Sequence, residues 1–232
     1  MSANMKGAQD APLTDSHNFS PTEEASGIIT RNLPARATQS AHLWGLHLYE
    51  GLPKQLTTDG IFAVAASYER VHAFVAEQYE MFTEEGLGCS PNTFAQKSKQ
   101  AYLSTGCDLI ALTHAGRTVG IMVGAPEDWS SYYVRVFALA PDYQRPSLTR
   151  RFVRECLFEP LARHGVERVV ADTNPANLAM TRLFGELGFF VTGNQLTDRW
   201  GALIRYTKFL DPACEQQFHR RFGGGAPRRK QR

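Results

Sequence analysis

Long apolar runs are absent from this sequence of 232 residues, and their absence excludes a first class of protein. No stretch of about 18 consecutive residues is apolar, so no helix is expected to span a membrane. The first 27 residues are polar and lack the apolar core of a secretory signal. We therefore expect a cytoplasmic protein that does not act at a membrane.

Cysteine is scarce as well. The few cysteines lie far apart and form neither a C-x-x-C pair nor a cluster with histidine, so no zinc or other metal site is predicted. Isolated thiols of this kind are typical of a reducing compartment. They are Cys89, Cys107, Cys156 and Cys214.

A strong charge of one sign is also missing, because 25 basic residues face 23 acidic ones, for a net charge of +2. The positive excess lies in residues 211–232, which hold six basic and two acidic side chains. Three glycines and a proline follow Phe222, and they predict a basic, flexible C-terminal tail over 211–232. Because the excess stays in this tail, no nucleic-acid surface is expected.

The other end of the chain is polar too, and the first 36 residues are rich in Ser, Thr, Asn, Ala and Pro. We interpret residues 1–60 as a partly disordered N-terminal extension and residues 61–210 as the folded domain. Whether the extension covers a binding site or forms a homodimer contact stays open.

Between residues 61 and 210, short apolar runs alternate with helical periodicity, which predicts a mixed α/β sheet with parallel and antiparallel pairs. Pro160 lies inside a helical pattern and predicts a kink or break near Cys156. Strands are expected near 61–65, 108–113, 118–124, 131–140, 167–171, 189–192 and 203–209. Helices are expected after Ser67, from Ser90 to about Leu103, around 148–161 and after Asn174.

Two segments of this domain carry a resemblance to a known family. The first is Phe137-Ala-Leu-Ala-Pro-Asp-Tyr-Gln144 with the Arg-rich helix after it. The second runs from Asp172 to Phe189 and is similar to the pattern N-x-x-A-x-x-[LF]-[YF]-x-x-x-G-F. Both resemble the GNAT family of acyl-CoA-dependent N-acyltransferases. The resemblance implies a largely antiparallel, twisted sheet flanked by helices, with a splayed central strand pair at the cofactor site.

The first segment implies a turn that binds the pyrophosphate of acetyl-CoA or another acyl-CoA. The family writes this turn as [QR]-G-x-G-x-[GA], because bare backbone must approach the phosphates closely. Here Arg145, Ser147 and Thr149 fill the three glycine positions. Their hydroxyl and guanidinium groups are able to replace backbone contacts. The turn residues implied to bind the cofactor are Gln144, Arg145, Ser147, Leu148, Thr149 and Arg150.

The resemblance also places the pantetheine arm along the edge of the fourth strand of the family's fold, beside Phe137, Ala138 and Leu139. Asn177 matches a position whose side chain contacts the arm in relatives. Phe184 stands where many relatives have a tyrosine that protonates the leaving thiolate, and a phenyl ring cannot donate a proton.

Three residues are candidates for the general base that acyl transfer to an amine requires. Many relatives have a carboxylate early in the strand that leads to the turn. Here Glu127 and Asp128 lie just before that strand, and either acts directly or through water. Tyr133 is the third candidate, with Arg135 on the same strand placed to lower its pKa. Each also has a purely structural interpretation, as a solvated loop charge or as strand packing.

The function predicted is transfer of an acetyl or other short acyl group from acyl-CoA to a primary amine, most simply a small molecule, in a ternary complex. Two alternatives stay open. The arginines of the turn and the basic tail suit a donor bound to an acidic acyl carrier protein. The missing glycines and Phe184 instead suit a non-catalytic binding module with this fold.

Overall fold

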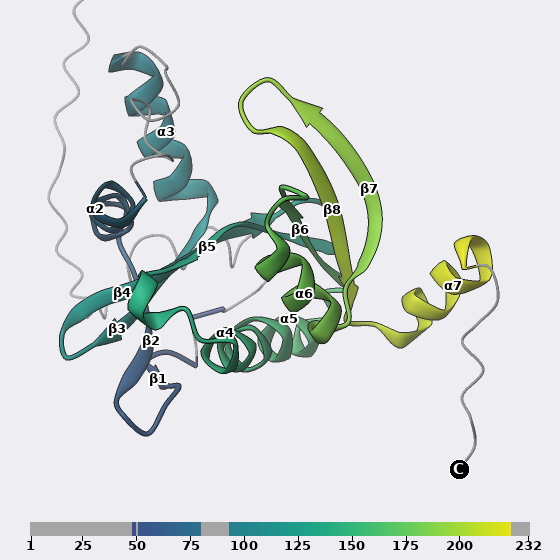
Figure 1. Ribbon diagram of the computed structural model, residues 1–232, viewed down its shortest axis with the longest axis horizontal. Coiled ribbons are helices and arrows are strands. Elements are labelled where there is room, and N and C mark those ends of the chain that lie inside the picture. Colours follow the sequence, from purple (N-terminus) through teal and green to yellow (C-terminus); the bar gives the residue numbers. More distant parts are fainter. Residues whose placement is uncertain (1–47, 50, 80–92, 224–232) are drawn as a thin grey trace, which may run out of the picture. The chain divides into compact units, whose positions relative to one another are not determined.

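The computed structural model describes residues 48–49, 51–79 and 93–223 (Figure 1). Its centre is one sheet with the order β1-β2-β3-β4-β5-β6-β8-β7, in which every neighbouring pair is antiparallel except β5 and β6. The strands are β1 (Lys54–Gln55), β2 (Ile61–Ala65), β3 (Asp108–His114), β4 (Arg117–Pro126), β5 (Ser131–Leu139), β6 (Arg168–Thr173), β7 (Phe190–Thr197) and β8 (Gly201–Phe209). This mixed, largely antiparallel sheet confirms the predicted fold class.

Helices cover both faces of the sheet (Figure 1). The helical segments are α2 (Tyr68–Gln78), α3 (Thr93–Gly106), η2 (Pro141–Tyr143), α4 (Pro146–Phe152), η3 (Val153–Phe158), α5 (Glu159–Arg163), α6 (Leu178–Leu187) and α7 (Pro212–Phe222). Side chains alternate across β3, so Leu109 joins Phe74 of α2 in one core, whereas Ile110 joins Phe152 of α4 in the other.

The strand β5 contains a bulge, and it parts from β6 at the same point. Val123 of β4 pairs with Val136 and the next residue, Gly124, pairs with Val134, so Arg135 is the extra residue. The parallel pairing with β6 ends at Val134, although β5 continues to Leu139. A bulge bends its strand and increases its twist. The predicted splayed strand pair is therefore present, and it opens at Arg135.

The helix after β5 is irregular where the sequence predicts it. A π-helical turn, η3, separates α4 from α5 and includes Cys156. Pro160 has no N–H group with which to bond the carbonyl of Cys156, so the regular ladder cannot continue there. The predicted kink or break near Cys156 is confirmed.

Both predicted domain boundaries need correction. Residues 212–222 form α7 rather than a flexible tail, because the carboxylate of Asp211 accepts a hydrogen bond from the N–H of Ala213 and caps the helix. The Phe218 ring packs on Phe209 of β8 at 5.2 Å. At the other end, Leu56 is fully buried, so the domain begins before residue 61. Residues 1–47, 50, 80–92 and 224–232, with Cys89, lie outside the described residues.

A glycine in β4 gives a test of this packing. A Cβ atom at Gly124 would lie 2.5 Å from the ring of Tyr132, which is fully buried and donates a hydrogen bond to Asp108 at 2.8 Å. We expect Gly124→Ala to lower the free energy of unfolding by about 1–3 kcal/mol through overpacking. Denaturant unfolding with circular dichroism measures it.

The matched control is Gly185→Ala in α6, where an added Cβ meets nothing within 4 Å. Because glycine is a poor helix former, this variant should instead gain about 0.5–1 kcal/mol. Equal effects of the two substitutions would contradict the packing described for β4 and β5.

Candidate active site

The gap between β5 and β6 begins after Val134 and is bordered by three residues that sequence analysis placed beside a cofactor. Phe137 lies on the α4 side, where its ring stacks on Phe152 at 5.2 Å. Ala138 lies in the core on the α2 side, and Leu139 is buried in the α4 core. The three side chains therefore hold β5 to both layers.

The end of β5 is held by two side chains whose role the sequence did not reveal. The carbonyl oxygen of Leu139 accepts hydrogen bonds from the hydroxyl of Tyr79 and from Nε2 of Gln144, the latter at 3.2 Å. Gln144, predicted as a phosphate ligand, thus fixes the strand end in this structure. Tyr79 follows α2, 60 residues away in sequence, so no local pattern could have identified it.

The turn after β5 accommodates its missing glycines without backbone strain. Arg145 has φ −103° and ψ 122°, an extended conformation that any residue adopts. Ser147 is exposed, whereas the side chains of Leu148 and Thr149 are buried beneath the helix start. By the geometry of a helix N-terminus, the N–H groups of Ser147 and Leu148 have no partner within the helix.

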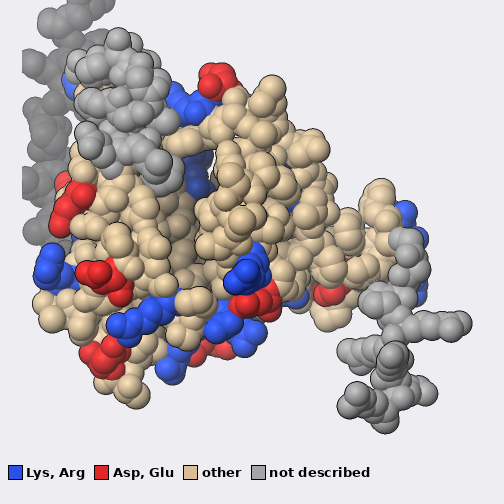
Figure 2. All heavy atoms as spheres, viewed as in Figure 1, with Lys and Arg blue, Asp and Glu red and all other residues tan. Residues whose placement is uncertain are grey.

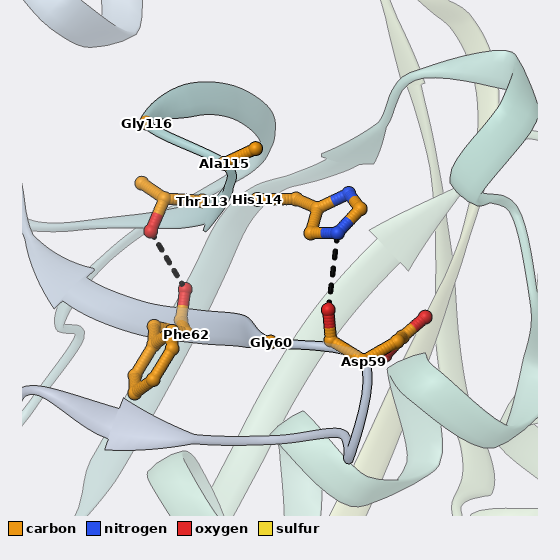
Figure 3. A pocket seen from close by; sticks show the side chains of 7 residues that line it. All are labelled: Asp59, Gly60, Phe62, Thr113, His114, Ala115 and Gly116. Atoms are coloured by element: carbon orange, nitrogen blue, oxygen red, sulfur yellow. Dashed lines mark hydrogen bonds between the residues drawn. The ribbon is translucent and has the colours of Figure 1, made fainter.

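A histidine at the end of β3 contacts Tyr143, which precedes this turn, and Asp59, which precedes β2; Figure 3 shows the contact with Asp59. His114 Nδ1 lies 2.8 Å from the hydroxyl of Tyr143, and its Nε2 lies 3.1 Å from the backbone oxygen of Asp59. A carbonyl only accepts, so Nε2 carries a proton and donates it. The carboxylate of Asp59 lies 3.7 Å from the Arg145 guanidinium. Asp59 and His114 line an open pocket of about 400 Å³.

Asp128, one of the predicted base candidates, has a structural role in the turn that leads into β5. Its Oδ1 accepts hydrogen bonds from the N–H groups of Ser130 and Ser131, both at 2.7 Å. Although burial raises the pKa of Asp128, these hydrogen bonds and the nearby Arg168 lower it below its usual value overall. The carboxylate therefore fixes the turn into β5 and has little tendency to take up a proton.

Tyr133 is also poorly suited to act as a base. Burial, followed by the charge of Asp172 and a hydrogen bond with it, raises the pKa of Tyr133 to about 12. Arg135 and Arg205 oppose this shift, but their effect is smaller. Arg135 lowers the pKa of Tyr133 as expected, but burial and Asp172 outweigh it, so the phenol is less acidic than an ordinary tyrosine.

A buried ion pair beside Tyr133 was not found from sequence. The Asp172 side chain is 2% exposed. It accepts two hydrogen bonds from Arg205, from Nε to Oδ1 at 3.1 Å and from Nη2 to Oδ2 at 3.2 Å. Nη1 of Arg205 lies 2.9 Å from the carboxylate of Glu127, the remaining candidate for the general base. Asp172 and Arg205 are directly opposed in the β6–β8 register, 33 residues apart in sequence.

The remaining predicted residues lie on α4 and α6. The Oδ1 atom of Asn177 accepts a hydrogen bond from the N–H of Met180 at 3.2 Å and caps α6. Phe184 is buried, with the rings of Phe189 and Tyr206 each 4.8 Å away. The Arg150 guanidinium lies 2.6 Å from Glu186, which joins α4 to α6. Contact of these residues with a cofactor stays a prediction.

Two absences apply to the described part of the chain. None of its helices is long and apolar enough to cross a membrane. Within the same residues, no group of three or more His, Cys, Asp and Glu side chains lies close enough to hold a metal ion.

Comparison with known families assigns the chain. Residues 71–189 match the acetyltransferase (GNAT) family, and the match spans the α2-to-α6 unit that builds the gap. The chain therefore belongs to the GNAT acetyltransferase family. A search of the curated proteins found no match.

Solved structures agree on the fold. The ribosomal-protein-S18-alanine N-acetyltransferase from Escherichia coli is 16% identical, with a TM-score of 0.51 over 65% of this chain and 94% of that chain. A ribosomal L7/L12 α-N-protein acetyltransferase in complex with coenzyme A is 13% identical, with a TM-score of 0.52 over 66% and 96%. A spermidine/spermine N-acetyltransferase from Vibrio cholerae is 12% identical, with a TM-score of 0.50 over 67% and 96%. At such identities the likeness concerns the fold alone.

The environment of Tyr133 leads to a direct prediction. In an ultraviolet-difference titration, the wild-type protein should show one more tyrosine that ionises near pH 12 than the Tyr133→Phe variant does. The variant should keep the pH profile of any activity near neutrality, since the phenol stays protonated there. Tyr68→Phe serves as a control. Loss of a tyrosine that titrates near or below pH 10 from Tyr133→Phe would contradict the described environment.

Proposed function

We propose that this protein transfers an acetyl or other short acyl group from acyl-CoA to a primary amine. The observation that carries the proposal is the bulge at Arg135, after which β5 leaves β6 and leads into the turn and helix start at residues 144–149. An extended arm is able to add to the free edge of β5 as a short strand. The coenzyme A in the structure of the L7/L12 acetyltransferase supports this choice of donor.

The helix start would hold the pyrophosphate without glycines. The amides of Ser147 and Leu148 and the N-terminal dipole of the helix attract anions. The exposed Ser147 hydroxyl adds a donor, and Arg150 on the first turns of the helix adds positive charge. Because Arg145 is extended, its side chain turns toward Asp59 rather than blocking these amides.

In the chemical step, the neutral amine nitrogen forms a bond to the thioester carbonyl carbon while the carbon–sulfur bond breaks and the thiolate leaves. A backbone N–H of β5 near the bulge would stabilise the developing oxyanion. The proton lost by the amine passes to water or to Glu127, the carboxylate that neither caps a turn nor lies buried. Phe184 supplies no acid, and a thiolate leaves with little help from one.

The charges around the turn favour acyl-CoA over a donor on an acidic carrier protein. Arg145 is paired with Asp59, Arg150 with Glu186, and Arg151 with Glu155. Glu155 is shared with Lys54, but the pairing of Arg145 and Arg150 reduces the positive charge that the turn presents to an acidic protein surface. A small dianionic pyrophosphate is instead able to compete for a single exposed guanidinium.

The Arg150–Glu186 pair gives a prediction in which two substitutions have opposite signs. Arg150→Gln should raise the KM for acetyl-CoA about three- to tenfold through loss of a charged phosphate contact. Glu186→Gln should leave that KM unchanged or lower it, since it releases the guanidinium from its carboxylate. Steady-state kinetics with varied acetyl-CoA measures both. A similar rise in the KM for acetyl-CoA in both variants would show that Arg150 does not bind the cofactor.

The proposed function is tested by titration calorimetry with coenzyme A and acetyl-CoA, followed by a thiol-release assay with a panel of primary amines. Micromolar affinity, about −8 kcal/mol, is expected. Acyl transfer to at least one amine is the expected result of the assay. Binding without transfer would favour the non-catalytic module, and no binding by folded protein would contradict the proposal.

A further inference from the structure

Arg135 is the bulged residue of β5, and its side chain is exposed at the mouth of the gap. Its guanidinium lies 5.5 Å from the centre of the Tyr102 ring on α3, a cation–π arrangement that orients the flat group. Figure 2 shows a hollow beside the part of the molecule that contains β7 and β8, with basic side chains inside it.

The charges around Arg135 do not balance. The carboxylates of Asp172 and Glu127 are both bound by Arg205. Among the residues that the structure describes, no carboxylate lies within ion-pair distance of the Arg135 guanidinium. An exposed arginine that is held by an aromatic ring and has no counterion among these described residues is able to bind a planar anion.

The position of Arg135 separates it from the pyrophosphate turn. Leu139, the last residue of β5, follows Arg135 by four positions, and a strand rises by about 3.3 Å per residue, so the strand ends ~13 Å away and the turn begins beyond it. Arg135 instead lies where the strand pair first opens. Under the proposed function, this point holds the thioester end of the donor and the incoming amine.

We propose that the acceptor is an amine that also carries a carboxylate, as amino acids do, and that Arg135 binds this carboxylate. This inference rests on the proposed function and names the class of its substrate. A bidentate guanidinium–carboxylate contact would orient the acceptor with its amine toward β5. The same positive charge repels polyamines, whose additional groups are cationic at neutral pH.

The test compares matched acceptors with acetyl-CoA as donor. The panel contains amino acids, their carboxamides, short peptides with and without acidic side chains, and spermidine. Acceptors with a carboxylate should show a kcat/KM about tenfold or more above their amides, as expected for a charge-assisted contact. Arg135→Gln should remove this preference by raising the acceptor KM, whereas Arg135→Lys should keep part of it.

Two controls separate this role from a structural one. The KM for acetyl-CoA and the rates with amides should stay unchanged in Arg135→Gln. Arg163→Gln, an exposed arginine at the end of α5, should leave every rate unchanged. Transfer to amides or spermidine as fast as to the carboxylates would overturn the inference alone. Transfer to no acceptor at all would contradict the proposed function and the inference with it.

Discussion

The bulge at Arg135 is the constraint on which the rest of the site depends, because it decides where β5 and β6 stop sharing hydrogen bonds. Backbone N–H and C=O groups near a protein interior need partners. Before the bulge, Ser131–Val134 find them in β6, and at the strand end Leu139 finds them in Tyr79 and Gln144. The segment between is held at both ends and has a free edge.

The two sides of this gap have different chemistry. Toward α4, the stacked rings of Phe137 and Phe152 form an apolar wall that keeps β5 rigid. Where the strands part, Arg135 lies against the Tyr102 ring of α3, and the partly buried Asp172–Arg205 pair fixes β6 to β8. If one partner of this pair is removed, the other keeps an uncompensated charge. The pair therefore has a structural role beside the gap and does not act as a general acid or base.

Sequence reasoning succeeded where one segment carries its own signal. The apolar runs of β3 and β4 and the effect of Pro160 on its helix are all local. The turn at 144–149 was located from its neighbours even though its glycines are missing. Its conformation shows why they are dispensable for folding, since Arg145 needs no left-handed backbone.

Sequence reasoning failed where the signal depends on register or on distant contacts. Asp172 and Arg205 meet only through the β6–β8 pairing, and His114 meets Tyr143 only because the hairpin packs beside the turn. The pKa of Tyr133 depends on burial more than on the adjacent Arg135, which a linear pattern cannot show. Asp211 and Pro212 form a recognisable helix start. The glycines after Phe222 nevertheless led to the prediction of a flexible tail from residue 211, although residues 212–222 form α7.

The central claim is that the free edge of β5 binds the arm of coenzyme A. Amide hydrogen exchange with and without saturating coenzyme A tests it most directly. The account predicts slower exchange in residues 135–139 and at Ser147 and Leu148, with no change in residues 131–134, which are already paired with β6. Unchanged exchange in 135–139 on bound protein would contradict it.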